Sequence, residues 1–477
     1  MSAGRRLLAP LSGLLLVLFV ATLSSTVIST ALPEMLGRLH GSPVQLTWVV
    51  TVALLTATAS TPIWGKLADL YSKKTLIHAA VAVFVVGSLA AGLSQSAGFL
   101  IAARAVQGAG VGGLQALAQI AIAAMIPPRE RGRYSGYLSS TTALSTIGGP
   151  LLGGLLVDTS WLGWRWCFFI GIPVAVAALV VLQATLRIPV VPRERVRIDY
   201  LGALTMTAGV GLLLVWVSFA GDAFAWWSWP SAALVTGALG LLALTGWVEA
   251  RAPEPILPLR ILRQRTTALA ILGSLAAGTA MYGAAVFLTQ YFQLARGFSP
   301  TAAGLLTIPM MAGILVTSLV GGRLVSRTGQ VKPFLVTGAI LLTAGLGLLG
   351  LTGARTSLVL MGVAMVAVGA GIGLTMQNFV LVVQNTVPLR DIGTASSTIA
   401  FFRSLGGTIG VSVLGAIYAR RIDTPAADDI AYGNATGTVF LISAAVAVLG
   451  IVAAVSLRPV SLRTSLDLPQ EPQSARG

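Results

Sequence analysis

The sequence predicts an all-α protein that crosses a membrane many times, and its composition and helix-length apolar runs support this fold class. Of 477 residues, 55% are hydrophobic and 10% are charged, whereas a soluble domain carries about a quarter charged residues. Apolar runs of about 20 residues, the length of a bilayer-spanning helix, recur along the chain. Membrane strands would instead show short alternating segments. We therefore expect helices throughout.

Fourteen apolar segments are predicted as membrane spans. They lie near residues 9–31, 45–64, 76–95, 98–124, 136–157, 166–186, 200–220, 229–248, 267–292, 302–322, 333–352, 357–380, 394–418 and 434–457. The first segment follows Arg5 and Arg6 as a secretory signal would, but it is long and lacks a small-residue cleavage site. We expect it to be retained as the first helix.

Basic residues crowd the loops on one predicted side of the membrane. With the N-terminus inside, 23 of the 31 lysine and arginine residues lie on the inner side, 6 lie outside, and Arg104 and Arg403 lie within spans. Cytoplasmic loops carry such an excess. We expect a multi-pass protein of the cell membrane with both termini cytoplasmic, and the preference for Arg over Lys points to bacteria. Topology thus explains the net charge of +16, and no nucleic-acid partner is expected.

Glycines repeat at a constant offset between the two parts of the chain. Residues 108, 110, 112, 132 and 149 are glycines, and so are the residues 261 positions later. Gly65-Lys66-Leu67 is similarly matched by Gly322-Arg323-Leu324, at an offset of 257. Such internal similarity indicates duplication. We expect six-helix bundles over 1–190 and 263–457, a linker with two inserted spans over 191–262, and a disordered cytoplasmic tail over 458–477.

Several motifs together resemble the major facilitator superfamily, specifically its fourteen-helix drug:proton antiporter branch. They are GKLADLYSKK at 65–74, RAVQGAGVGG at 104–113, STIGGPLLGG at 145–154, GWRWCFFIGIP at 163–173 and the linker residues 199–202. The resemblance runs from about residue 10 to 457. It implies two helical bundles that alternate access to a central cavity, and export of small molecules in exchange for protons.

The loop motif at 65–74 contains residues suited to hold two helix ends together. Gly65 permits close approach of helices, Asp69 can interact with a helix N-terminus, and Lys73 and Lys74 hold the loop at the inner face. Such contacts could latch the bundles in an outward-facing state. The alternative is an ordinary basic inner loop. Leu70 and Ser72 stand where the family usually has a basic residue and a glycine.

The fifth span has small residues at every fourth position. Ser145, Gly149 and Gly153 form a smooth face for close helix packing, and Pro150 removes a backbone donor and favours a kink. This helix could seal the cavity against leakage during exchange. Plain helix packing is the alternative.

Arg104 is the leading candidate for proton coupling, because a charge within a span is costly and usually functional. The matching arginine is tied to proton transfer in the family. The family also usually has an aspartate in the first span, but Ser24 stands there in this chain. No acidic residue is expected at mid-membrane. Glu34 and Asp158 lie nearest to it, at the outer ends of their spans. We expect them to accept protons, with helix capping or solvation as the alternative.

Polar and methionine side chains within the spans are candidates for the substrate cavity. They are Gln115, Gln119, Gln290, Tyr291, Met310, Met311, Gln377, Asn378 and Arg403. Methionine adapts to varied ligands, although a core-filling role is equally open. Because no acid lies at mid-membrane, a neutral or anionic amphiphile suits this chain better than a permanent cation.

Three functional classes follow from these observations. The first is a proton-coupled exporter of drugs or antibiotic-like molecules, and the second is an exporter or facilitator of a native metabolite or lipid without coupling through a first-span carboxylate. A membrane enzyme or receptor is third, because we find no acid pair, metal-ligand cluster or phosphate-binding loop. We therefore expect no metal, no cofactor and a monomeric protein in a lipid bilayer.

Overall fold

The computed structural model of the chain describes residues 3–39, 43–159, 162–188, 199–221, 223–252, 254–353, 355–422, 429–459 and 461–466. Among these residues the regular elements are helices, and the only β-pairing is two isolated bridges. Thirteen helical segments are long and apolar enough to cross a membrane. The predicted all-α, multi-pass membrane protein is confirmed.

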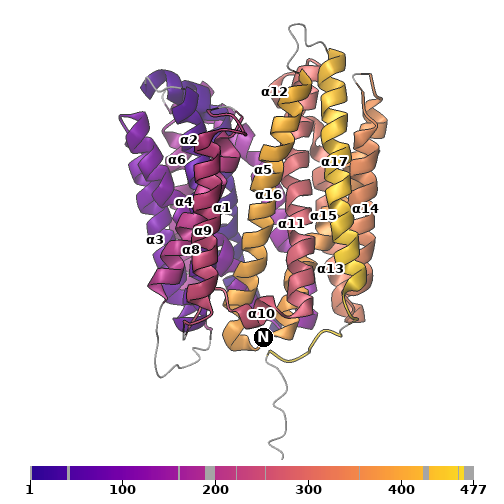
Figure 1. The fold of residues 1–477 in the computed structure, drawn as a ribbon. Coiled ribbons are helices and arrows are strands. Elements are labelled where there is room, and N and C mark those ends of the chain that lie inside the picture. The colour runs from indigo at the N-terminus through magenta and orange to yellow at the C-terminus, as the bar shows by residue number, and fades with distance from the viewer. Residues whose placement is uncertain are drawn as a thin grey trace, which may run out of the picture.

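The first half of the fold consists of helices that pack largely on one another (Figure 1). They are α1 (Ala3–Leu39), α2 (Pro43–Leu70), α3 (Lys73–Gly92), α4 (Ala97–Met125), α5 (Pro128–Asp158), α6 (Trp166–Phe169) and α7 (Gly171–Thr185). The predicted span 166–186 is thus divided into α6 and α7. The predicted span 136–157 lies within α5, which is not among the thirteen apolar segments. Its many Ser, Thr and Gly residues make α5 less apolar than the other long helices.

Two long helices and one short helix connect the halves. They are α8 (Tyr200–Phe219), α9 (Trp229–Glu249) and α10 (Leu259–Leu262). Helix α8 contacts α2 in the first half and α16 in the second, whereas α9 packs mainly on α8. The α8–α9 hairpin therefore lies beside the line where the two halves meet.

The second half of the fold is also entirely helical (Figure 1). Its elements are α11 (Arg265–Gln290), the π-helical turn η1 (Tyr291–Ala295), α12 (Pro300–Leu306), α13 (Ile308–Thr328), α14 (Lys332–Gly350), α15 (Leu358–Thr386), the 3₁₀ turn η2 (Leu389–Asp391), α16 (Ile392–Ile422) and α17 (Asp429–Ser456). The predicted span 302–322 is divided at Thr307, since Pro309 has no amide hydrogen to continue α12.

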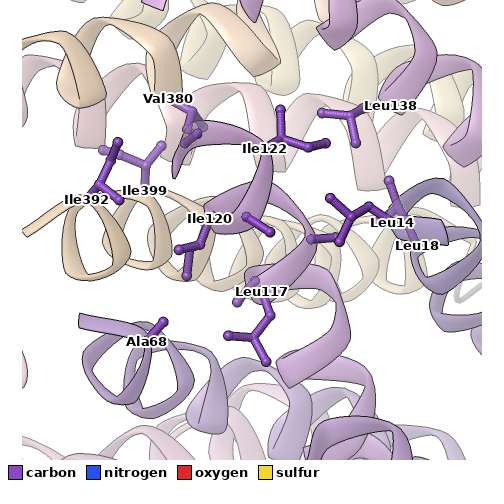
Figure 2. Packing of buried hydrophobic residues seen from close by; sticks show 14 of the residues in the cluster. Leu14, Leu18, Ala68, Leu117, Ile120, Ile122, Leu138, Val380, Ile392 and Ile399 are labelled. Carbon is purple, nitrogen blue, oxygen red and sulfur yellow. The ribbon is translucent and has the colours of Figure 1, made fainter. Parts of the chain in front are cut away.

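One hydrophobic core crosses both halves at the end where the N-terminus lies. It includes Leu14 of α1, Leu117 of α4, Val380 of α15 and Ile399 of α16, and Figure 2 shows these elements meeting around α4. At the opposite end, the described residues form separate clusters, one within the first half around Phe168 and one within the second half. We call the end where the N-terminus lies the terminal side and the opposite end the far side. The halves are therefore joined by apolar packing at the terminal side.

Residues 461–466 also lie on the terminal side, packed against the second half. The Leu462 amide donates to the Gly329 carbonyl (2.9 Å), and the Arg463 amide donates to Oδ1 of Asn385 (3.0 Å). The Arg463 carbonyl accepts from the Arg129 amide of α5 (3.0 Å). Disorder was expected from residue 458, but backbone hydrogen bonds hold this segment across both halves.

Candidate functional site

The Asp69 side chain at the end of α2 caps the N-terminus of α16 in the other half. Its Oδ1 accepts from the Gly393 amide (2.7 Å), and its Oδ2 accepts from the amide and the hydroxyl of Thr394 (2.7 Å each). Asp69 is buried. A carboxylate that accepts the first amides of a helix satisfies donors that have no partner within the helix and favours the helix dipole.

Gly65 and Gly393 let the two helix ends approach closely beside this cap. A Cβ on Gly393 would lie 2.5 Å from the Gly65 carbonyl oxygen, and a Cβ on Gly65 would lie 2.9 Å from the Gly393 oxygen. Neither position has room for a side chain unless the backbone moves. Asp69, Thr394, Gly65 and Gly393 together are named the carboxylate latch.

A second contact between the halves repeats this geometry with neutral groups. The Ser326 hydroxyl of α13 accepts from the Arg133 amide of α5 (2.9 Å), and a Cβ on Gly132 would lie 2.5 Å from the Gly322 oxygen. The four residues are offset from those of the carboxylate latch by 257 or 261 positions. We name this contact the serine latch, and it matches the repeat seen in the sequence.

Ion pairs link the segment that follows the α8–α9 hairpin to both halves near the carboxylate latch. Lys66 of α2 binds Glu254 (Nζ to Oε2, 2.5 Å), and Arg260 of α10 binds Asp391 (2.9 Å). The Lys74 ammonium instead donates to the Gln183 carbonyl within the first half (2.6 Å), and Lys73 begins α3. Because Arg260 is mostly exposed, its pair contributes little by itself.

Three of the predicted cavity residues meet behind the latches. Gln119 of α4 faces Gln377 and Asn378 of α15 around a cavity of about 30 Å³, which Arg131 and Gln384 also line. The Arg131 guanidinium donates to Oε1 of Gln384 (2.9 Å), and this amide in turn donates to Ser396 (2.8 Å). A space of this size holds water and no drug-sized molecule. Among the described residues, the terminal side is therefore closed around this space.

Arg104 is buried within the first half and joins three helices. Its Nε donates to the Val49 carbonyl of α2 (3.1 Å), and its Nη1 donates to Oε1 of Gln107. The Gln107 side-chain amide in turn donates a hydrogen bond to the hydroxyl of Ser88 in α3 (2.8 Å). Among the described residues, no acidic side chain lies within hydrogen-bonding distance of Arg104. Its neighbours are therefore neutral acceptors.

The two predicted proton acceptors lie on the far side. Glu34 is half-buried and lies 3.7 Å from Arg38, one turn along α1, and its Oε2 atom is buried without a hydrogen-bond partner in the described part of the chain. Asp158 is the last residue of α5, but its side chain lies outside the described residues. Ser24 is buried in α1.

Helix α5 packs closely on α1 through its small residues. The Thr26 hydroxyl donates to the Ser145 carbonyl (3.1 Å), and the Ser145 hydroxyl donates to the Phe19 carbonyl (3.2 Å). A Cβ on Gly149 would lie 2.0 Å from the Thr26 hydroxyl oxygen. Gly153 is buried, and the side chain of Pro150 lies outside the described residues.

The other predicted cavity residues are dispersed. Tyr291 is fully buried and donates to the Gly353 carbonyl (2.8 Å), and Met310 belongs to the core of the second half, with Met311 packed against it. These positions suit packing. Gln115 is half-buried in α4, whereas Gln290 Oε1 is buried without a partner among the described residues.

Arg403 lies within α16, where that helix packs on α11. A Cβ on Gly278 of α11 would lie 2.1 Å from the Arg403 carbonyl oxygen. The Nη1 atom of Arg403 is buried and has no hydrogen-bond partner in the described part of the chain. A buried guanidinium nitrogen without an acceptor is costly, so this cation is a candidate contact for an anionic or carbonyl-bearing ligand.

Sequence reasoning did not identify three buried charges on the terminal side. They are Arg131, Asp391 and Glu249, whose carboxylate accepts from the amides of Ile256 (3.0 Å) and Leu257 (3.1 Å). Each lies at a helix end, where hydropathy predicts solvated loop residues. The repeated glycines Gly132 and Gly393 lie beside Arg131 and Asp391 in the sequence. They were the sequence feature that could have indicated these two buried charges.

Comparisons with known proteins agree with this architecture. The family model of the Major Facilitator Superfamily matches residues 14–199 and 190–411. An uncharacterised MFS-type transporter of Mycobacterium tuberculosis (strain H37Rv) is 38% identical over 88% of this chain, which spans 62% of that relative's length. The multidrug transporter protein MdtP of Bacillus subtilis is 33% identical over 86% of this chain and 75% of its own.

A solved structure shares the fold. The human organic anion transporter MFSD10 aligns with 95% of this chain and 100% of its own, with a TM-score of 0.66 and 14% identity. At this identity the likeness concerns the fold alone. It supports the overall fold of two packed helical halves, and the family model and the B. subtilis relative show the family. The chain belongs to the major facilitator superfamily of membrane transporters.

Proposed function

We propose that this protein is a secondary active transporter that exports neutral or anionic amphiphilic molecules, including drugs or antibiotic-like metabolites, in exchange for protons. The proposal places both termini in the cytoplasm of a bacterial cell. It is carried by one observation: a continuous core and two latches close the terminal side, whereas the far-side cores of the two halves are separate. Such a closed terminal side is one of the two states that alternating access requires.

The substrate class follows from the charges inside the spans. Arg104 is buried, Arg403 is half-buried with a buried Nη1 atom, and neither binds an acidic side chain among the described residues. In a medium of low dielectric constant, an uncompensated cation repels a cationic ligand and attracts an anion or a polarised carbonyl. The name of the B. subtilis relative, a multidrug transporter, supports small molecules as the cargo.

The proton pathway is proposed to run through the far-side acids. Glu34 has one carboxylate oxygen buried without a hydrogen-bond partner among the described residues, and its other oxygen lies 3.7 Å from the exposed Arg38, so protonation there removes a charge that only this exposed cation offsets. Asp158 ends α5, the helix that carries the serine latch at its other end. Protonation of either acid would then bias the same equilibrium that the latches control.

Transport into everted membrane vesicles tests the proposal. With an acidic vesicle interior, neutral and anionic amphiphiles should accumulate inside, whereas permanent cations of similar size should not. Accumulation of cations alone would overturn the substrate class.

A second function is favoured by Ser24, which stands in place of the family's first-span aspartate. An exporter or facilitator of a native metabolite or lipid needs no titrating group there. Downhill transport that is indifferent to the pH gradient would identify this alternative.

A further inference from the structure

A cavity of about 830 Å³ lies on the far side, between the α8–α9 hairpin and the end of α16. It is separate from the small space behind the latches. Its walls are the tryptophans of the hairpin on one side, and Val413, Ile417 and Arg420 of α16 on the other. Because Trp227 and Trp229 in its wall are exposed, the cavity opens at the protein surface, where the spans face the surrounding bilayer. An occupant can therefore enter sideways from the membrane.

The hairpin wall contains both a fixed part and an open part. Trp216 donates to the Ser231 hydroxyl (2.6 Å) and packs edge-to-face on Trp226, with ring centroids 5.4 Å apart. Trp227 and Trp229 are instead 96% and 81% exposed. Tryptophan gathers at the level of lipid headgroups, where its ring is apolar and its N–H is wet. The cavity therefore lies at the headgroup level of one leaflet.

Arg420 supplies the charge of this cavity. It is exposed at the mouth and makes no hydrogen bond or ion pair within the described residues. None of the described residues that line the cavity is acidic. The site thus combines an apolar wall with one uncompensated cation, which is complementary to an anionic headgroup attached to an acyl chain.

We propose that this cavity binds an anionic phospholipid of the far-side leaflet, with the phosphate at Arg420 and an acyl chain along Ile417 and the exposed tryptophans. The volume lies within the range of small-molecule sites, about 300 to 1,000 Å³, which suits a headgroup and the first part of one chain. The bound lipid fills the gap between the hairpin and α16. This inference concerns lipid binding and does not depend on the transported substrate.

Tryptophan quenching by brominated lipids tests the site in the full-length protein. The protein is placed in bilayers of phosphatidylcholine that contain brominated phosphatidylglycerol or, at the same fraction, brominated phosphatidylcholine. The wild-type protein should prefer the anionic lipid roughly fivefold, the selectivity that one arginine near an anionic surface provides. Arg420→Gln should reduce this ratio to about one, whereas Arg421→Gln, an adjacent exposed arginine outside the cavity wall, should keep it.

A second variant locates the bound lipid. Replacing Trp227 and Trp229 by phenylalanine should remove most of the quenching that is specific to phosphatidylglycerol. Equal quenching of the wild-type protein by both lipids would overturn the proposal, as would a preference that persists in Arg420→Gln. Specific quenching that survives the double tryptophan variant would place the anionic lipid elsewhere and would also overturn it. Transport activity does not enter any of these readouts.

Discussion

The Oδ2 atom of Asp69 in α2 lies 2.7 Å from both the amide nitrogen and the hydroxyl oxygen of Thr394 in α16, 325 positions further along the chain. One carboxylate thus completes the N-terminus of a helix from the other half. In the corresponding contact, Ser326 accepts from Arg133 through a neutral hydroxyl. Hydrogen bonds to charged groups are about twice as strong as neutral ones, so the two latches differ in strength.

Asp69→Asn should open the terminal side more often, because an amide oxygen lacks the charge that favours the helix N-terminus. The reporter is a cysteine at Gln377, behind the latches, in a background without Cys167. Its labelling by an impermeant maleimide from the terminal side should be roughly tenfold faster, the effect of losing a charge-assisted hydrogen bond. Ser326→Ala should accelerate labelling less. Equal effects of the two substitutions would contradict the difference in strength.

Gly393→Ala should prevent the terminal side from closing, because its Cβ would lie 2.5 Å from both the Gly65 oxygen and Asp69 Oδ1. Gly415→Ala is a matched control in the same helix, since a Cβ there meets nothing within 4 Å. The same cysteine reporter should label faster in the first variant and at the wild-type rate in the second. A wild-type rate in Gly393→Ala would show that close approach of the helices is not needed.

Ending the chain after residue 460 should also weaken closure, because the Arg463 carbonyl and amide connect α5 to the end of α15. Ending it after residue 466 keeps every contact described for this segment. Labelling of the Gln377 reporter should be faster in the shorter chain and unchanged in the longer one. Identical rates in both would assign residues 461–466 no part in closure.

The helical architecture could be predicted from the sequence because bilayer thickness sets the length of every span. The constant offset between glycines also predicted the repeat, and the structure agrees with it. Gly65 packs on Gly393, and Gly322, the repeat partner of Gly65, packs on Gly132, the repeat partner of Gly393. Which face of a helix meets the cavity could not be predicted. Tyr291 and Met310 are apolar enough for either position, and only tertiary packing places them in the core. Buried charges at helix ends, such as Glu249, were not predicted, because tertiary packing also decides which helix ends are buried.

Arg104→Ala should impair export and substrate exchange alike, because Arg104 links α2, α3 and α4 through Val49, Gln107 and Ser88. Removing it leaves buried acceptors without a donor, which costs about 1 to 3 kcal/mol. Arg104→Lys keeps the charge but cannot reproduce the fork of donors. Both rates are measured in vesicles, with thermal unfolding as the control for stability. Intact exchange in Arg104→Ala would restrict the residue to proton coupling.

Proton-coupled export is tested most directly by neutralising both far-side acids in one protein. In everted vesicles with an acidic interior, Glu34→Gln/Asp158→Asn should lose pH-driven accumulation but keep downhill substrate exchange. Exchange needs only the interconversion of the two states, whereas uphill export needs a group whose protonation biases that equilibrium. Loss of pH-driven transport with retained exchange is the predicted result. Full pH-driven transport by the double variant would contradict the assignment of the proton to Glu34 or Asp158.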